Sequence, residues 1–324
     1  MISQIRTASR LHFGLLALPP GPEEPSSELK RFWGGIGLMI EQPGIELVVE
    51  PSEDWAAVGP SSERVLGFVE AFRNSHPENT ELGPFQFRVR KSAPEHVGFG
   101  TGTQLGLATA RLLAEYCDVA DKSAVALAKL IGRGRRSAIG IHGFDVGGFL
   151  VEGGKTTSEN ISPLIARFDF PDDWRVILIS PGEITPIHGT HEVQVFQELR
   201  SAYKQRMPTE DLCRLVLLGL LPSLGEQDCQ AFGQALTEFN YTVGEIFARV
   251  QGGGYAHPMS EEIVQFVQTE GVAGIAQSSW GPTMAAITDS LEMAVFLKRR
   301  LEVRFPNLSS VEITKARNLG AEIA

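Results

Sequence analysis

A glycine-rich segment at residues 94–106 carries the clearest chemical signal in this sequence of 324 residues. Glycines in such a loop allow positive φ angles and let a ligand approach the backbone closely. The apolar, alanine-rich helix expected to follow would direct its free N–H groups and its dipole at the same place. We therefore predict an anion site for phosphate or pyrophosphate. Its candidate ligands are Gly98, Gly100, Thr101, Gly102, Thr103 and Gln104.

The glycine-rich loop matches neither of two widespread phosphate-binding loops. It lacks the Gly-Lys-Ser/Thr ending of a Walker A loop. An acidic residue after a second strand, which would complete a dinucleotide fingerprint, is not evident either. A strand-to-helix turn that binds nothing is the alternative interpretation.

A second group of candidate anion ligands lies in the run Gly-Arg-Gly-Arg-Arg-Ser at residues 132–137. Guanidinium groups match phosphate oxygens with two parallel hydrogen bonds, so the run predicts a second phosphate site. Arg133 and Arg136 are the first candidates, ahead of Arg135. The alternative is a solvated helix end, where cations are favourable beside the carboxyl-terminal dipole.

The elements that would position these residues alternate between strand and helix patterns. Strands are expected at 2–7, 11–18, 44–50, 85–90, 144–152 and 176–180, and helices at 62–76, from 103, at 120–131 and over much of 192–249 with a break at 221–223. The alternation predicts an α+β protein of two layers. The charged, proline-containing stretch at 159–173 indicates a domain boundary, which gives domains at 1–165 and 166–324.

Composition narrows the classes of function. The net charge of -10 argues against nucleic-acid binding, which depends on cationic contacts to phosphate. The three cysteines, Cys117, Cys213 and Cys229, are far apart, so neither a zinc site nor a disulfide framework is indicated. No stretch approaches the ~18 apolar residues of a membrane span. We expect a soluble cytoplasmic protein.

Residues 94–104 resemble the second motif of the GHMP kinases, Pro-x-x-x-Gly-Leu-Gly-Ser-Ser. Phe99 stands for the leucine, and Thr101 and Gly102 stand for the two serines, so one hydroxyl is missing. The segment at 9–14 is similar to the first motif, and the segment at 277–283 stands where the third belongs. The resemblance implies a two-domain GHMP-kinase-like fold with the phosphate loop in its first domain.

Further segments narrow the resemblance to the β-ribofuranosylaminobenzene 5'-phosphate synthases: 34–37, 132–140, 144–149, 277–283 and 315–321. That family condenses 4-aminobenzoate with phosphoribosyl pyrophosphate, with loss of carbon dioxide and pyrophosphate, in tetrahydromethanopterin biosynthesis. The resemblance implies Mg²⁺ as cofactor and a homodimer. It adds Ser278, Ser279 and Trp280 as substrate-binding residues.

The chemistry of such a reaction suggests roles for three more residues. Arg10 is the candidate cation for the benzoate carboxylate, and His12 is a candidate acid, base or carboxylate ligand, with a core histidine as its alternative. Asp145, before Gly147 and Gly148, is a candidate catalytic, metal or ribose ligand, with a turn-capping aspartate as its alternative. The His-x-x-H spacing at 188–191 is a weak metal signal without a third ligand.

An ATP-dependent GHMP-type small-molecule kinase is the competing hypothesis. Many of these kinases place a catalytic aspartate about seven residues before a Gly-Gly pair. Counting back from Gly147 reaches Gly140, which argues against phosphoryl transfer. A non-catalytic binding protein on the same scaffold is the third class, and the motifs shared with one synthase family weigh against it.

Overall fold

The computed structural model describes residues 3–18, 31–75, 82–117, 119–157, 159–182, 195–196 and 208–324. The strands are β1 (Ser3–Ala17), β2 (Trp33–Pro51), β3 (Ala56–Val58), β4 (Phe85–Lys91), β5 (Phe149–Glu152), β6 (Leu164–Phe168), β7 (Arg175–Ser180), β8 (Gly274–Gln277), β9 (Met284–Thr288), β10 (Ser310–Thr314) and β11 (Glu322–Ile323). The helices are α1 (Ser62–Ser75), α2 (Thr101–Glu115), α3 (Ala124–Leu130), α4 (Ile139–Val146), α6 (Thr209–Leu215), the π-helical turn η1 (Val216–Leu220), α7 (Leu221–Glu226), α8 (Cys229–Gln251), α9 (Ser260–Thr269) and α10 (Leu291–Arg304).

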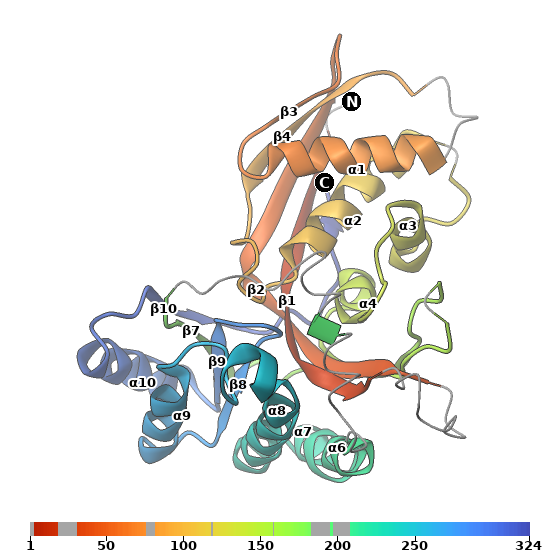
Figure 1. The fold of residues 1–324 in the computed structure, drawn as a ribbon. Coiled ribbons are helices and arrows are strands. Elements are labelled where there is room, and N and C mark those ends of the chain that lie inside the picture. Colours follow the sequence, from red (N-terminus) through yellow and green to blue (C-terminus); the bar gives the residue numbers. More distant parts are fainter. Residues whose placement is uncertain are drawn as a thin grey trace.

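Two sheets organise these elements, which confirms the predicted α+β class. The first has the order β11-β1-β2-β4-β3, with β5 added to β2 and β6 added to β5. The second has the order β10-β7-β9-β8. Helices α1 to α4 lie beside the first sheet, and α8 to α10 lie beside the second (Figure 1). The boundary predicted at residues 165 and 166 lies inside β6, so the first sheet extends past it.

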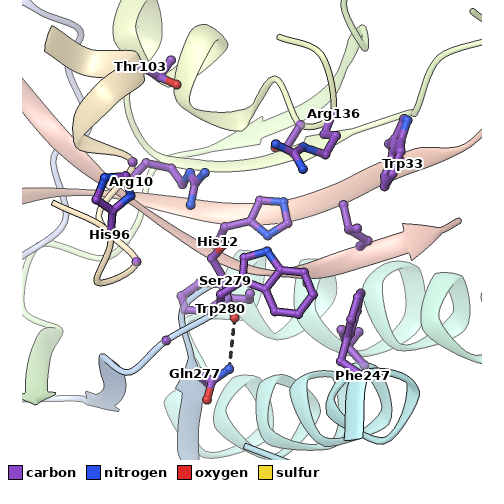
Figure 2. A pocket seen from close by; sticks show the side chains of 18 of the residues that line it. Arg10, His12, Trp33, His96, Thr103, Arg136, Phe247, Gln277, Ser279 and Trp280 are labelled. Atoms are coloured by element: carbon purple, nitrogen blue, oxygen red, sulfur yellow. Dashed lines mark hydrogen bonds between the residues drawn. The ribbon is translucent and has the colours of Figure 1, made fainter. Parts of the chain in front are cut away.

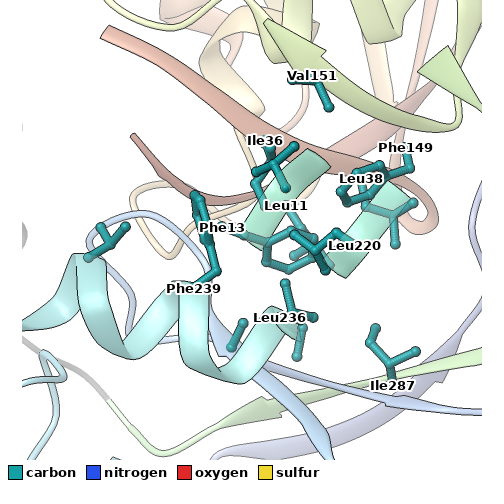
Figure 3. Close-up of a cluster of buried hydrophobic side chains, with 14 of the residues drawn as sticks. Leu11, Phe13, Ile36, Leu38, Phe149, Val151, Leu220, Leu236, Phe239 and Ile287 are labelled. Carbon is teal, nitrogen blue, oxygen red and sulfur yellow. The ribbon is translucent and has the colours of Figure 1, made fainter. Parts of the chain in front are cut away.

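Strand β1 divides its length between two cores. Near its start, Ile5 packs with α1, α2 and α4 in one apolar cluster. Farther along, Leu11 and Phe13 join the opposite cluster, which contains Phe239 of α8 (Figure 3). A third cluster joins α9 and α10 to the other face of the second sheet. The two expected strands at 2–7 and 11–18 are thus one long strand that passes from one core to the next.

Two local expectations were wrong for physical reasons. Residues 144–146 end helix α4 and do not begin a strand, because Gly147, with φ 60°, caps that helix and β5 starts at Phe149. The break expected at 221–223 is absent, since Pro222 lies in the first turn of α7. A missing N–H is tolerated there. No helix in the described part of the chain is long and apolar enough to cross a bilayer.

Asn240 connects the two sheets through a buried side chain on α8. Its Nδ2 donates to the carbonyl oxygens of Phe13 in β1, at 2.8 Å, and of Gln277 in β8, at 3.0 Å. Its Oδ1 accepts from the N–H of Gln277 at 2.8 Å. A single amide therefore satisfies three buried backbone groups on two sheets.

We expect Asn240→Leu, which keeps the branched shape but removes the amide, to lower the free energy of unfolding by roughly 3 kcal/mol or more, because three buried polar groups lose their partner. The measurement is urea unfolding followed by circular dichroism. The control is Asn160→Leu at an exposed asparagine, which should change stability by less than about 0.5 kcal/mol. Equal stability of the two variants would contradict the role given to Asn240.

Candidate functional site

A cavity of about 940 Å³ lies where β1, the glycine-rich loop, the arginine run and the turn after β8 meet. Its polar lining in the described chain is Arg10, His12, Arg64, His96, Thr101, Thr103, Arg133, Arg135, Arg136, Ser137, Asn240, Gln251, Gln277 and Ser279. Gly98, Gly100 and Gly102 line it with their backbone, and Trp280 closes one side. Segments predicted separately from the sequence therefore share one space.

The hydroxyl of Ser278 fastens three of these segments together. It accepts a hydrogen bond from the N–H of His12, at 3.0 Å, and donates one to the carbonyl oxygen of Gly98, at 2.7 Å. The N–H of Ser279 donates to the His12 carbonyl, and the N–H of Arg10 donates to the Phe99 carbonyl. Ser278 is fully buried and does not line the cavity, so its position does not support the predicted role in substrate binding.

The glycine-rich loop ends at the amino terminus of α2. Gly100 is the N-cap, with φ 68° and no side-chain cap, and Gly98 has φ 106°. A Cβ at Gly98 would come within 2.6 Å of the Ser278 carbonyl oxygen. Both positions therefore require glycine, and the uncapped helix start faces the cavity, as an anion site needs.

Two predicted loop ligands have structural partners in the fold. The Thr101 hydroxyl donates to the Pro94 carbonyl at 2.7 Å. The buried Gln104 amide donates to the Gly140 carbonyl at 2.6 Å and lies outside the cavity lining. Thr103 lines the cavity and keeps its predicted role as a candidate donor (Figure 2).

Among the residues that the structure describes, five guanidinium groups line the cavity: Arg10, Arg64, Arg133, Arg135 and Arg136. No aspartate or glutamate is among its described lining residues. Burial lowers the pKa of Arg133 to about 10, and the charges of Arg64 and Arg135 act in the same direction, so the group remains charged at neutral pH. Such a concentration of like charge is suited to a polyanionic ligand.

The arginine run is held in place through its backbone. The buried Lys155 ammonium donates to the carbonyl oxygens of Gly134, at 2.8 Å, and of Arg135. The buried Glu152 carboxylate accepts from the N–H of Ala138 at 2.7 Å. Burial raises the pKa of Glu152 and lowers the pKa of Lys155. Neither side chain was singled out from the sequence, because both lie well after the loop that they hold.

His12 points into the cavity from β1 between the aromatic and cationic groups (Figure 2). The residue is 5% exposed, and its Nε2 has no hydrogen-bond partner in the described part of the chain. Burial, and after it the charge of Arg10, lowers the pKa of His12 to about 3. The imidazole is therefore neutral at physiological pH and presents one nitrogen to whatever the cavity holds.

Aromatic rings form the other end of the cavity. Trp33 contacts Phe196 edge to face, with 4.9 Å between ring centroids, and Phe247 contacts Trp280 at 5.0 Å. Phe196 contacts Trp280, with 5.6 Å between ring centroids, and the Arg136 guanidinium lies 5.5 Å from the centroid of the Phe196 ring. The cavity thus has an aromatic end and a cationic end, which Arg136 joins.

Asp145 lies outside the cavity lining, so the structure does not support its predicted role as a ligand there. Its Oδ1 pairs with Arg111 at 2.9 Å, and its Oδ2 accepts from the N–H of Ala124 at 2.8 Å. The carboxylate joins α4 to α2 and to the start of α3. The sequence signal, a short acid before two glycines, cannot distinguish this link from a metal ligand.

The described residues do not fit the Mg²⁺ implied by the resemblance. Proteins usually hold this ion through one or two carboxylates together with substrate phosphates. The described lining of the cavity has no carboxylate, and no group of three or more His, Cys, Asp or Glu residues in the described ranges could hold a metal. The pair at 188 and 191 lies outside the described residues.

Family models match two parts of the chain. Residues 63–153 match the GHMP kinases N terminal domain, and residues 220–307 match the GHMP kinases C terminal domain. The solved structure of L. major mevalonate kinase in complex with R-mevalonate is similar, with TM-score 0.69, 13% identity and coverage of 97% of this chain and 96% of that one. Homoserine kinase from Cytophaga hutchinsonii has TM-score 0.67 and 14% identity, with 99% and 97% covered. These likenesses confirm the predicted GHMP-kinase-like fold.

Curated relatives match most of the chain at higher identity. A beta-ribofuranosylphenol 5'-phosphate synthase from Methanothermobacter thermautotrophicus is 33% identical in an alignment of length 307, which covers 88% of each chain. The protein with the same name from Archaeoglobus fulgidus is 32% identical in an alignment of length 340, which covers 99% of each chain.

We expect Arg133→Ala to weaken the binding of inorganic pyrophosphate by roughly 1.5–3 kcal/mol, as for a lost charge-assisted hydrogen bond. Arg133→Lys should restore only part of the loss, because an ammonium lacks the planar fork. The measurement is calorimetric titration. Arg73→Ala is a matched control, since Arg73 lies 5.0 Å from the Trp55 ring as Arg133 lies 4.8 Å from the Phe68 ring. Equal affinity in all variants would remove Arg133 from the site.

We expect His12 to make stability depend on pH. Because its pKa falls from 6.5 to about 3 on folding, the unfolded chain binds this proton first as the pH decreases. The contribution of His12 to the free energy of unfolding is constant above pH 6.5. Below pH 6.5 it falls by up to about 1.4 kcal/mol per pH unit. Urea unfolding at pH 7 and pH 5 should show a larger drop in the native protein than in His12→Gln. An equal drop in both would contradict the buried, neutral imidazole.

Proposed function

Because the chain belongs to the family of the beta-ribofuranosylphenol 5'-phosphate synthases, we propose that it joins phosphoribosyl pyrophosphate to a para-substituted benzoate, with loss of carbon dioxide and pyrophosphate. The resemblance noted in the sequence names 4-aminobenzoate. The phenol in the relatives' name corresponds to 4-hydroxybenzoate by the same reaction. Tetrahydromethanopterin biosynthesis is the pathway that the resemblance implies.

The two-ended cavity is the observation that carries this proposal. A pyrophosphate and a 5'-phosphate suit the cationic end, where the five arginines and the start of α2 meet. A flat benzoate ring suits the end built from Trp33, Phe247 and Trp280, because ring faces and edges pair favourably. Arg10, on the strand between the two ends, is the proposed cation for the benzoate carboxylate.

The proposed reaction needs positioning and charge neutralisation more than a nucleophilic side chain. The bond between ribosyl C1 and pyrophosphate breaks, and its electron pair leaves with pyrophosphate. The ring carbon that carries the carboxylate bonds to C1, and the bond to the carboxyl carbon then breaks. That electron pair restores the aromatic ring as carbon dioxide leaves. Neutral His12 serves as a hydrogen-bonding group, since no proton transfer is required for balance.

The kinase alternative has less support. Gly102 replaces a motif hydroxyl, and no acid in the described lining could act as a catalytic base toward an alcohol. The Mg²⁺, the homodimer and the cytoplasmic location implied by the resemblance or by composition stay predictions. We propose that magnesium, where the reaction uses it, arrives bound to the substrate's phosphates.

We expect carbon dioxide to be released from carboxyl-labelled 4-aminobenzoate or 4-hydroxybenzoate only when phosphoribosyl pyrophosphate is present, with one pyrophosphate formed per carbon dioxide. Magnesium is supplied and withheld in parallel reactions. Unsubstituted benzoate is the control and should release none, because no para group stabilises the cationic ring. ATP-dependent phosphorylation of a small alcohol without release of carbon dioxide would overturn the proposal in favour of a kinase.

A further inference from the structure

Arg64 and Gly102 lie directly against each other at the start of α2. A Cβ at position 102 would be 2.1 Å from Nη2 of Arg64 and 3.5 Å from Nη2 of Arg133. A Cβ atom does not approach an unbonded heavy atom to 2.1 Å, so any residue other than glycine would displace the Arg64 guanidinium. The guanidinium of Arg64, from helix α1, thus fills the space that a Cβ at position 102 of helix α2 would occupy.

The Arg64 side chain is anchored on its far side. Its Nη1 pairs with Oε2 of Glu95 at 2.7 Å, and Glu95 also accepts a hydrogen bond from the Ser61 hydroxyl. Burial opposes ionisation of Glu95, but the contacts with Ser61 and Arg64 lower its pKa overall. The arginine side chain is 30% exposed. One nitrogen of the fork is thus held by the carboxylate while the other stands over Gly102 and lines the cavity.

We propose that Arg64 is a phosphate ligand of the glycine-rich loop and that Gly102 is the residue that admits it. A guanidinium group then stands where the second serine of the kinase-type motif would place its side chain. The inference rests on the proposed function, because the ligand class is the pyrophosphate of the same substrate. The glycine leaves room for the guanidinium, so the loop has a fixed positive charge where the motif's second serine would supply a neutral hydroxyl.

The surroundings of the pair favour an anion. Arg64 and Arg133 approach the same point from different elements, and the positive end of the α2 dipole faces it as well. Like charges held this close repel each other until an anion lies between them. A pyrophosphate with several oxygens can accept from both guanidinium groups and from loop N–H groups at once.

The test is calorimetric titration of inorganic pyrophosphate into Arg64→Ala, Gly102→Ala and the double variant. We expect each single change to weaken binding by about 10- to 100-fold, the first by removing the guanidinium and the second by displacing it. The double variant should bind as Arg64→Ala does, because the methyl group has no guanidinium left to displace. Gly102 lacks a positive φ and lies in a helix, so alanine is tolerated by the backbone.

Several outcomes would overturn the inference. Native-like affinity for pyrophosphate in Arg64→Ala would show that Arg64 does not bind the phosphate. A further loss of affinity in the double variant would show that the methyl group at position 102 blocks the anion directly. Arg64→Ala exposes the Glu95 charge, so Arg64→Ala/Glu95→Gln is included. Recovered affinity in that variant would attribute the loss to repulsion by Glu95. Arg73→Ala, also on α1 but outside the lining, is the control and should bind normally.

Kinetics separates this inference from the proposed function. Relative to the native enzyme, Arg64→Ala should have a higher KM for phosphoribosyl pyrophosphate, by about the factor by which it weakens pyrophosphate binding. The KM for the benzoate should stay unchanged. A native protein that binds pyrophosphate through Arg64 but releases no carbon dioxide would refute the proposed reaction and leave the phosphate ligand standing. Equal changes in both KM values would indicate general damage to the site and refute the specific role.

Discussion

The hydroxyl of Ser278 is the contact on which the site depends. It accepts from β1 at His12 and donates to the glycine-rich loop at Gly98, so residues that are 266 and 180 positions away in the chain meet at one oxygen atom. Ser278 and His12 are buried, so the Ser278 hydroxyl and the His12 N–H would each lack a partner without this contact. Because the contact is made to backbone groups, it fixes the paths of strand and loop. The direction of the His12 ring and the opening of α2 toward the cavity follow from those paths.

The cationic end of the cavity shows a second constraint, which is how like charges are kept together. The arginine run is fixed through its carbonyl and N–H groups by Lys155 and Glu152. Those two side chains are buried behind the run, and neither lines the cavity. Holding the backbone in this way leaves the guanidinium groups to be arranged by rings and by neighbouring charges. Arg133 accordingly lies over Phe68, and Arg136 over Phe196.

Local patterns predicted much of this site, and long-range contacts account for the rest. The glycine-rich loop was predicted from the sequence because its glycine spacing indicates a turn before a helix start. Arg133 was predicted because it lies in a run of glycines and arginines. Arg64 was missed because it lies in an ordinary amphipathic helix and acquires its meaning only against Gly102. Asp145 was given a ligand's role because its partners, Arg111 and Ala124, belong to other helices. The aromatic end combines four rings from residues 33 to 280, which no local pattern connects.

The contrast between the cavity and the rest of the chain has a kinetic meaning. The protein carries a net charge of -10, yet five arginines from the described part of the chain line one cavity. An acidic exterior repels a polyanion from most of the surface, while low-dielectric walls concentrate the positive field at the cavity mouth. Such a field would guide the diffusion of a phosphorylated molecule toward the cavity. A benzoate carries one negative charge and a sugar pyrophosphate carries several, so the same field would attract the benzoate more weakly, and added salt would slow the arrival of the phosphorylated molecule more.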